Sequence, residues 1–83
     1  MNLNANDDMD NIRDTCSFFV GTTSSVPANT PTNAVCFGFV IKHSENACTQ
    51  IAVTRNTVNT SLYIRKYYGS WSSWGYINIT LNQ

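Results

Sequence analysis

Hydrophobic and polar residues alternate with a period of two in two runs near the C-terminal end of the chain, residues 50–55 and residues 61–66. The large apolar side chains of these runs share one face, at Ile51, Val53, Leu62 and Ile64. The intervening positions carry Gln50, Ala52, Thr54, Tyr63 and Arg65. Because successive side chains of a β-strand point to opposite faces, the pattern predicts two half-buried strands, joined into a hairpin by the polar residues 56–60.

Three further segments are predicted to be strands, residues 16–20, 34–42 and 76–81. The central one has an unbroken apolar face, formed by Val35, Phe37, Phe39 and Ile41. Its other face carries the small residues Cys36, Gly38 and Val40, so we expect a bulky group to pack there. In the last strand we expect inward-facing side chains at Ile77, Ile79 and Leu81.

The N-terminal region is acidic and polar, and residues 1–6 are interpreted as a linker or cloning junction. Asn6 is predicted to cap one or two helical turns, in which the acidic residues complement the helix dipole. Met9 and Ile12 share a face of these turns at a spacing of three. Residues 26–33 hold both prolines and are predicted to form an extended loop.

The predicted fold is mainly β (small α+β): a compact antiparallel sheet of about five short strands with a short N-terminal helical turn. Residues 7–83 are expected to form it as a single knob-like domain, because 83 residues are enough for one core only. A hydrophobic content of 42% argues against disorder. The net charge is zero, so the chain has no electrostatic attraction for nucleic acid or an anionic membrane.

Three cysteines, Cys16, Cys36 and Cys48, form neither a disulfide framework nor a zinc signature. We expect them to be small buried hydrophobes, although a single bridge stays open. Reduced thiols would suit a reducing compartment. The longest mainly apolar run, residues 34–41, is too short to cross a bilayer, and no signal peptide is recognisable.

Catalysis generally needs an acid or base and a partner that orients it. The single histidine, His43, lies in a predicted turn at residues 43–47, with only Glu45 as an acidic neighbour, and no serine sits in a nucleophile elbow. Asp8 and Asp10 resemble the start of a calcium loop, but the required pattern is broken by Ile12, Arg13 and Phe19. The sequence therefore predicts no enzyme, no metal site and no cofactor.

Aromatic residues crowd the segment that follows the hairpin turn, at Tyr63, Tyr67, Tyr68, Trp71, Trp74 and Tyr76. A tryptophan buries about 150–250 Å², so a small domain can scarcely leave two of them exposed, and we expect Trp74 in or against the core. Arg65 is expected to stack on Trp71 or Trp74. The aromatic residues left over by the core, namely Tyr67, Tyr68 and one tryptophan, are candidates to meet a ligand.

The order Gln-Ile, then Tyr-x-Arg, then Gly-Ser-Trp-x-x-Trp resembles the pyocin-knob type domain of phage tail fibres and pyocin tail proteins. The matching positions are Gln50, Ile51, Tyr63, Arg65, Trp71 and Trp74. The resemblance covers residues 7–81 and is looser in the N-terminal half, where Cys-Ser-Phe-Phe replaces the Gly-x-Tyr common in the family. It implies a piece of a longer fibre protein, a virion component assembled in the bacterial cytoplasm and acting as a homotrimer. The structural signature would be Gln50, Tyr63, Arg65 and Trp74.

The resemblance implies a non-enzymatic tip domain that attaches to a bacterial surface receptor, a polysaccharide or lipopolysaccharide. Sugars pack their C–H faces on aromatic rings and pair their hydroxyls with amide, hydroxyl and guanidinium groups. The candidate ligand-binding residues are therefore Tyr67, Tyr68, Trp71, Arg65, Asn56 and Asn59. Neither a nucleic-acid partner nor membrane insertion is expected.

Two alternatives stay open. The domain could be a purely structural knob that organises the fibre trimer, in which case the exposed aromatic residues should lie at a subunit interface. It could also be a carbohydrate-binding module appended to a hydrolase, which predicts a catalytic domain elsewhere in the parent chain.

Overall fold

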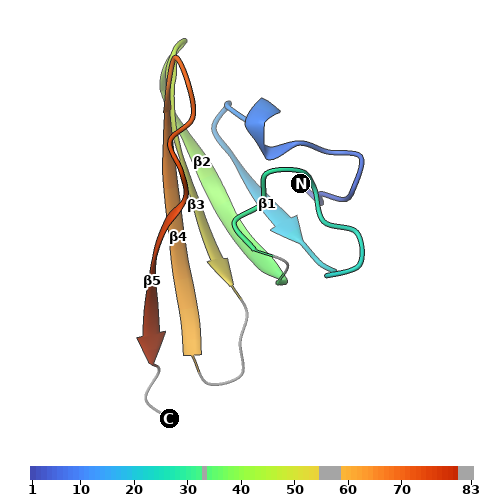
Figure 1. Ribbon diagram of the computed structural model, residues 1–83. Coiled ribbons are helices and arrows are strands. Elements are labelled where there is room, and N and C mark those ends of the chain that lie inside the picture. The colour runs from blue at the N-terminus through green and yellow to red at the C-terminus, as the bar shows by residue number, and fades with distance from the viewer. Residues whose placement is uncertain (33, 55–58, 81–83) are drawn as a thin grey trace.

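The computed structural model describes residues 1–32, 34–54 and 59–80, and its centre is one antiparallel sheet in which every strand pairs with its sequence neighbour (Figure 1). The five strands are β1 (Cys16–Val20), β2 (Cys36–Ser44), β3 (Ala47–Thr54), β4 (Asn59–Tyr68) and β5 (Gly75–Thr80). A short 3-10 turn, η1 (Met9–Asn11), precedes them. The predicted mainly β fold with five strands and an N-terminal helical turn is confirmed.

The hairpin between β2 and β3 is tighter than the sequence pattern predicts. Residues 43–47 were expected to be a turn, but β2 continues through Ser44, and only Glu45 and Asn46 separate the two strands. His43 therefore belongs to a strand and not to a loop.

The helical turn begins two residues later than predicted. Asp8, in extended backbone geometry, is the N-cap, and its side chain accepts a hydrogen bond from the Asp10 N–H at 2.9 Å. Asn6, the predicted cap, instead belongs to a preceding turn, in which its N–H donates to Asn4 Oδ1. No helix in the described part of the chain has the length and apolar character needed to span a bilayer.

Residues 1–6, interpreted from the sequence as a linker, take part in the fold. The Leu3 N–H donates to the Phe19 carbonyl at 2.9 Å, and the Phe19 N–H donates to the Met1 carbonyl at 2.8 Å. The side chain of Leu3 is buried in the core. The first residues thus run along the outer edge of β1 and pair with backbone groups that would otherwise be exposed.

One face of the sheet is covered by the N-terminal segment and by the loop between β1 and β2, which lie on the same side (Figure 1). We call it the covered face, and its buried side chains are Phe18, Val20, Cys36, Val40, Cys48, Gln50, Ala52, Thr54, Ser61 and Arg65. Leu3 and Met9 complete the core from above. The fully buried Met9 belongs to the same core cluster as Cys36 and Val40 of β2, in agreement with the expectation that a bulky group packs on this face.

The three cysteines belong to this face and are free thiols. Cys36 and Cys48 are buried, as expected of small hydrophobes, and Cys16 is half-buried. Burial raises the pKa of all three thiols, which keeps them protonated and poorly nucleophilic.

The opposite face is apolar, and among the described residues nothing covers it. We call it the open face, and its large side chains are Phe19, Phe37, Phe39, Ile41, Ile51, Val53, Leu62, Ile64, Ile77 and Ile79. Seven of these ten remain 39–58% exposed. The prediction that the last strand turns its isoleucines inward is wrong for Ile77 and Ile79, because the N-terminal cover lies on the other side; Leu81 is outside the described residues.

Candidate functional site

Arg65 of β4 is the centre of the predicted signature, and only 5% of it is exposed. Its Nε donates to Gln50 Oε1 on β3 at 2.8 Å, and its Nη1 donates to Asp10 Oδ1 at 2.9 Å. Burial lowers the pKa of the guanidinium, and the adjacent Asp10 carboxylate opposes that shift. An arginine keeps its charge under such conditions, so the contact with Asp10 is an ion pair between the sheet and the N-terminal turn.

Trp71 and Trp74 enclose the same guanidinium. The Arg65 Cζ atom lies 3.8 Å from the ring centroid of Trp71 and 4.7 Å from that of Trp74. The predicted stacking is therefore confirmed for both rings, and such cation–π contacts are each worth about 0.5–2 kcal/mol. Each indole also donates its N–H to a backbone carbonyl, Trp71 to Asp10 at 3.2 Å and Trp74 to Asn29 at 3.0 Å.

Gln50 extends the network to the backbone of the N-terminal segment that covers this face, which we call the covering segment. Its Nε2 donates to the carbonyls of Met9 and Ile12, both at 2.8 Å, while its Oε1 accepts from Arg65. An irregular chain has carbonyls that no regular secondary structure satisfies, and leaving them buried and unpaired would be costly. The fully buried Gln50 donates to the Ile12 carbonyl and adds a second hydrogen bond to the Met9 carbonyl, which also accepts from the Ile12 N–H.

The loop between β1 and β2 is fixed to this network through Asn29, which has a positive φ of 62°. Its Nδ2 donates to Asp8 Oδ1 at 2.8 Å, and this hydrogen bond is the main reason that the pKa of Asp8 is lowered. The neighbouring Ala28 exchanges backbone hydrogen bonds with Asp7 and Met9, each at 3.0 Å. The predicted extended loop is thus paired with the N-terminal segment.

The signature residues Gln50, Arg65 and Trp74 accordingly contact one another or the segments that cover the sheet. Trp74 is half-buried and packs against the core. Tyr63, the fourth signature residue, is also half-buried against the core, and its ring lies 5.3 Å from that of Tyr76. These contacts hold the covering segment, the loop and β4 together.

The predicted ligand-binding residues do not form one site. Arg65 and Trp71 line a hollow of about 320 Å³ on the covered side, together with Asp10, Asn29, Thr30, Ser72, Ser73 and Trp74. The Arg65 Nη2 atom is buried and has no hydrogen-bond partner among the described residues, but it presents almost no surface to that hollow. Asn56 lies outside the described residues; Asn59 begins β4, and the described part does not include its side chain.

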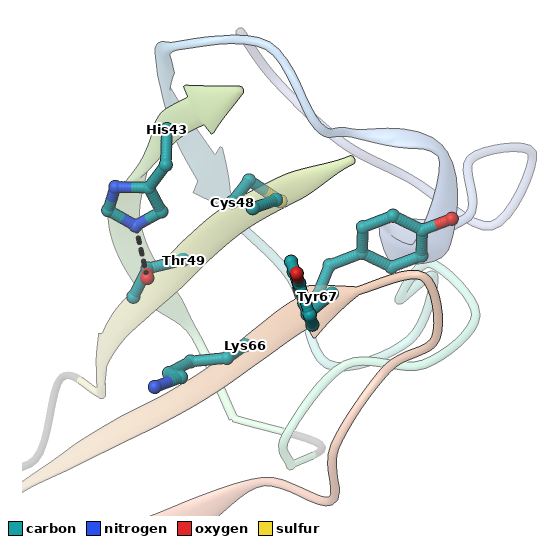
Figure 2. Close-up of a pocket in the computed structure, with 7 residues that line it drawn as sticks. His43, Cys48, Thr49, Lys66 and Tyr67 are labelled. Atoms are coloured by element: carbon teal, nitrogen blue, oxygen red, sulfur yellow. Dashed lines mark hydrogen bonds between the residues drawn. The ribbon is translucent and has the colours of Figure 1, made fainter. Parts of the chain in front are cut away.

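Tyr67 and Tyr68 line a different hollow, of about 490 Å³, at the end of the sheet near the β2–β3 turn. Its other lining residues are His43, Ala47, Cys48, Thr49 and Lys66. Figure 2 shows His43 and Thr49 on neighbouring strands, joined by a hydrogen bond of 2.8 Å between Nε2 and Oγ1, with Lys66 on the next strand. The hollow therefore combines aromatic surface with three side chains that can form hydrogen bonds.

The two tyrosines of this hollow differ in how much of each side chain is exposed to solvent. Tyr67 is half-buried, its ring centroid lies 5.2 Å from that of Trp71, and the guanidinium carbon of Arg13 lies 4.6 Å above its ring. Tyr68, the next residue, is 82% exposed. Of the aromatic residues predicted to meet a ligand, Tyr68 is the one that the fold leaves uncovered.

His43, Thr49 and Lys66 were not among the predicted site residues. Thr49 and Lys66 are directly paired in the β3–β4 register, and His43 approaches them because β2 continues past the predicted turn. The signal for this grouping was the hairpin register, which the misplaced turn concealed.

Comparisons with models of protein families, with curated proteins and with solved structures find no match to this chain.

Proposed function

We propose that the chain is a non-enzymatic domain of a phage tail fibre or tail-like bacteriocin, and that it attaches to a polysaccharide of the bacterial surface through the hollow beside Tyr68. The observation that carries the proposal is the 82% exposure of Tyr68 next to a hollow with hydrogen-bonding side chains. The C–H face of a sugar ring would stack on the Tyr68 ring. Its hydroxyl groups would pair with Lys66, Thr49 and His43.

The resemblance to pyocin-knob domains supports the same proposal. Gln50, Arg65, Trp71 and Trp74 carry that resemblance, and all four belong to one connected group of hydrogen bonds and ring contacts. A sequence signature made of interlocked structural residues would be kept while the surface around it changes its ligand. In this proposal the signature supports the fold, and the hollow beside Tyr68 sets the specificity.

A single shallow site of this kind would bind weakly. In a trimeric fibre three equivalent sites would face the same cell surface, and such multivalency raises apparent affinity by about 10²–10⁴ without any new contact. The proposal therefore places the domain on the virion, as one of three copies. Stacking and hydrogen bonding require no acid–base pair, metal or cofactor.

A binding experiment with two matched variants tests the proposal. The labelled chain, fused to a trimeric coiled coil, is applied to a panel of bacterial surface polysaccharides and to intact cells. We expect strain-selective binding that falls about tenfold or more in Tyr68→Ala, equivalent to about 1.4 kcal/mol or more. The control is Tyr76→Ala, which removes a ring that is 61% exposed on the other side of the sheet and should bind normally.

Three results would count against the proposal. The first is no binding by the folded, trimeric wild type, and the second is equal loss in both variants. The third is loss only when the other hollow is altered, for example in Ser73→Arg, which would move the site to the surface beside Trp74.

The structural knob is the second candidate function, and the open face favours it. A sheet face with seven large apolar side chains at least 39% exposed is typical of a surface that packs against protein. If the domain only organises a fibre, it should assemble through this face, and the folded, trimeric fusion should bind none of the polysaccharides.

A further inference from the structure

The open face is large enough to be an interface. A large apolar side chain that is fully accessible presents about 150–250 Å², so the seven side chains exposed by 39–58% together present roughly 600 Å². That is the upper end of the roughly 300–600 Å² found for the largest apolar patch of a typical monomer. Two such faces in contact would bury about 1,200 Å², the lower bound of a stable interface at roughly 1,200–2,000 Å².

The charge of the face is suited to a second copy of the same chain. Among the described strand residues that point to this side, Lys66 is the only Lys, Arg, Asp or Glu, and it lies at the end near the hollow. The net charge of the whole chain is zero, so two copies do not repel each other. The described residues of the face include no cluster of basic residues of the kind with which proteins bind anionic lipid surfaces.

The two halves of the face differ in shape. The half formed by β1 and β2 is aromatic, with Phe19, Phe37 and Phe39, and the half formed by β4 and β5 is aliphatic, with Ile64, Ile77 and Ile79. A two-fold axis along the strands, or a threefold axis parallel to them, would bring the aromatic half of one copy against the aliphatic half of the next. Aromatic and β-branched side chains pack well between sheets about 10 Å apart.

We infer that the open face is the interface through which copies of this chain assemble, sheet against sheet, with the two halves of the face apposed. The inference goes beyond the proposed function and holds whatever the hollow beside Tyr68 binds. In such an assembly the uncovered apolar side chains pack against those of another copy. The end of the sheet that carries the hollow beside Tyr68 lies at the rim of the interface.

The molar mass of the 83-residue chain, without any fusion, tests the inference. Light scattering and sedimentation over a concentration series should give a reversible oligomer of the 9.3-kDa chain. Phe39→Glu, in the middle of the face, should raise the dissociation constant at least about tenfold. The milder double variant Phe39→Thr/Ile64→Thr keeps strand-compatible side chains and should act in the same direction if Phe39→Glu fails to fold. Tyr76→Glu, which changes an exposed ring of β5 on the other side of the sheet, should assemble like the wild type.

A wild type that stays monomeric at every concentration overturns the inference. So does an oligomer that persists in both open-face variants, since the free edge of β5 would then be the contact. Binding of the monomer to neutral lipid vesicles, lost in Phe39→Glu, would overturn it in favour of a lipid partner. Because sugar binding is measured on Tyr68→Ala, which retains the open face, failure of the proposed function and failure of this interface give different results.

Discussion

Adjacent rows of side chains across β2, β3 and β4 differ sharply in chemistry. Phe39, Ile51 and Ile64 form one row on the open face, where nothing in the described part of the chain covers them. One position further along, Gln50 and Arg65 are directly paired on the covered face and almost completely buried. The more polar of the two rows is therefore the one inside the fold.

The covered face is the more polar one because the segment that covers it is irregular. The covering segment is a single 3-10 turn and irregular chain, whose carbonyls need donors, and Gln50 meets two of them at 2.8 Å. A polar sheet face is required under such a cover, because buried backbone groups without partners are costly. The apolar side chains of the open face pack against no covering segment within the described part of one copy. This agrees with the proposal that they pack against another copy.

Removing Arg65 should give the largest loss of stability. Arg65→Ala leaves Gln50 Oε1 and the Asp10 carboxylate without their donor and empties the space between two indole rings. Removing one partner of a fully buried ion pair costs about 3–5 kcal/mol. Because the Asp10 side chain is 39% exposed, the loss should lie near the lower end of that range. Urea unfolding followed by tryptophan fluorescence measures the loss, and Lys66→Ala, an exposed neighbour on the same strand, is the control. A loss below about 1 kcal/mol would show that the polar network is not what holds the cover.

Gly38→Ala should come next. A Cβ at Gly38 would lie 1.8 Å from the Ile51 carbonyl oxygen, so β3 would have to shift. Overpacking of this kind costs about 1–3 kcal/mol. The loss at Gly38 should lie at the upper end of that range, because the atoms that the new Cβ would meet are backbone atoms of β3. Gly75→Ala is the matched control, because its Cβ would meet only Ile64 O at 3.9 Å. Equal unfolding midpoints for the two alanine variants would contradict the close packing of β2 on β3.

A pair of threonine substitutions compares the faces directly. Val40→Thr puts a hydroxyl into the fully buried covered face, and this should cost about 1–3 kcal/mol. Ile77→Thr changes a side chain that is 58% exposed on the open face, and in dilute solution its effect should stay within about 0.5 kcal/mol. Chemical denaturation at low protein concentration measures both. The reverse order of the two losses would mean that the open face is the real core.

Acid should weaken the covered face by a smaller amount. The hydrogen bond from Asn29 lowers the pKa of Asp8 in the folded chain, so unfolding takes up a proton at acid pH. The stability contributed by Asp8 is complete above the unfolded pKa of about 3.9 and is lost as pH falls through the lower folded value. Tryptophan fluorescence during acid titration should report release of the Asn29 loop from Trp74. Asp8→Asn should flatten this dependence, and an unchanged titration would exclude Asp8 as its source.

The sequence predicted the parts of the site but not how they are grouped. Stacking of Arg65 on the tryptophans followed from a cation and two aromatic rings close together in the chain, and the structure confirms it. The separation of Trp71 from Tyr68 into different hollows was not predictable from their spacing, because Tyr68 ends β4 whereas Trp71 lies in the connection that follows it. His43 was missed because the position of a two-residue turn decides the register of the whole hairpin.

By itself the sequence determined the strands, their alternation and the residues that share each face, because the period of two is a local property of extended backbone. It did not determine which face is buried. Judged by hydrophobicity alone, Ile77 and Ile79 point inward, yet they are exposed, while Gln50 and Arg65 are in the core. That choice was made by the tertiary structure: Leu3 and Met9 bring an irregular segment onto the sheet, and the carbonyls of Met9 and Ile12 accept hydrogen bonds from Gln50 on the covered face.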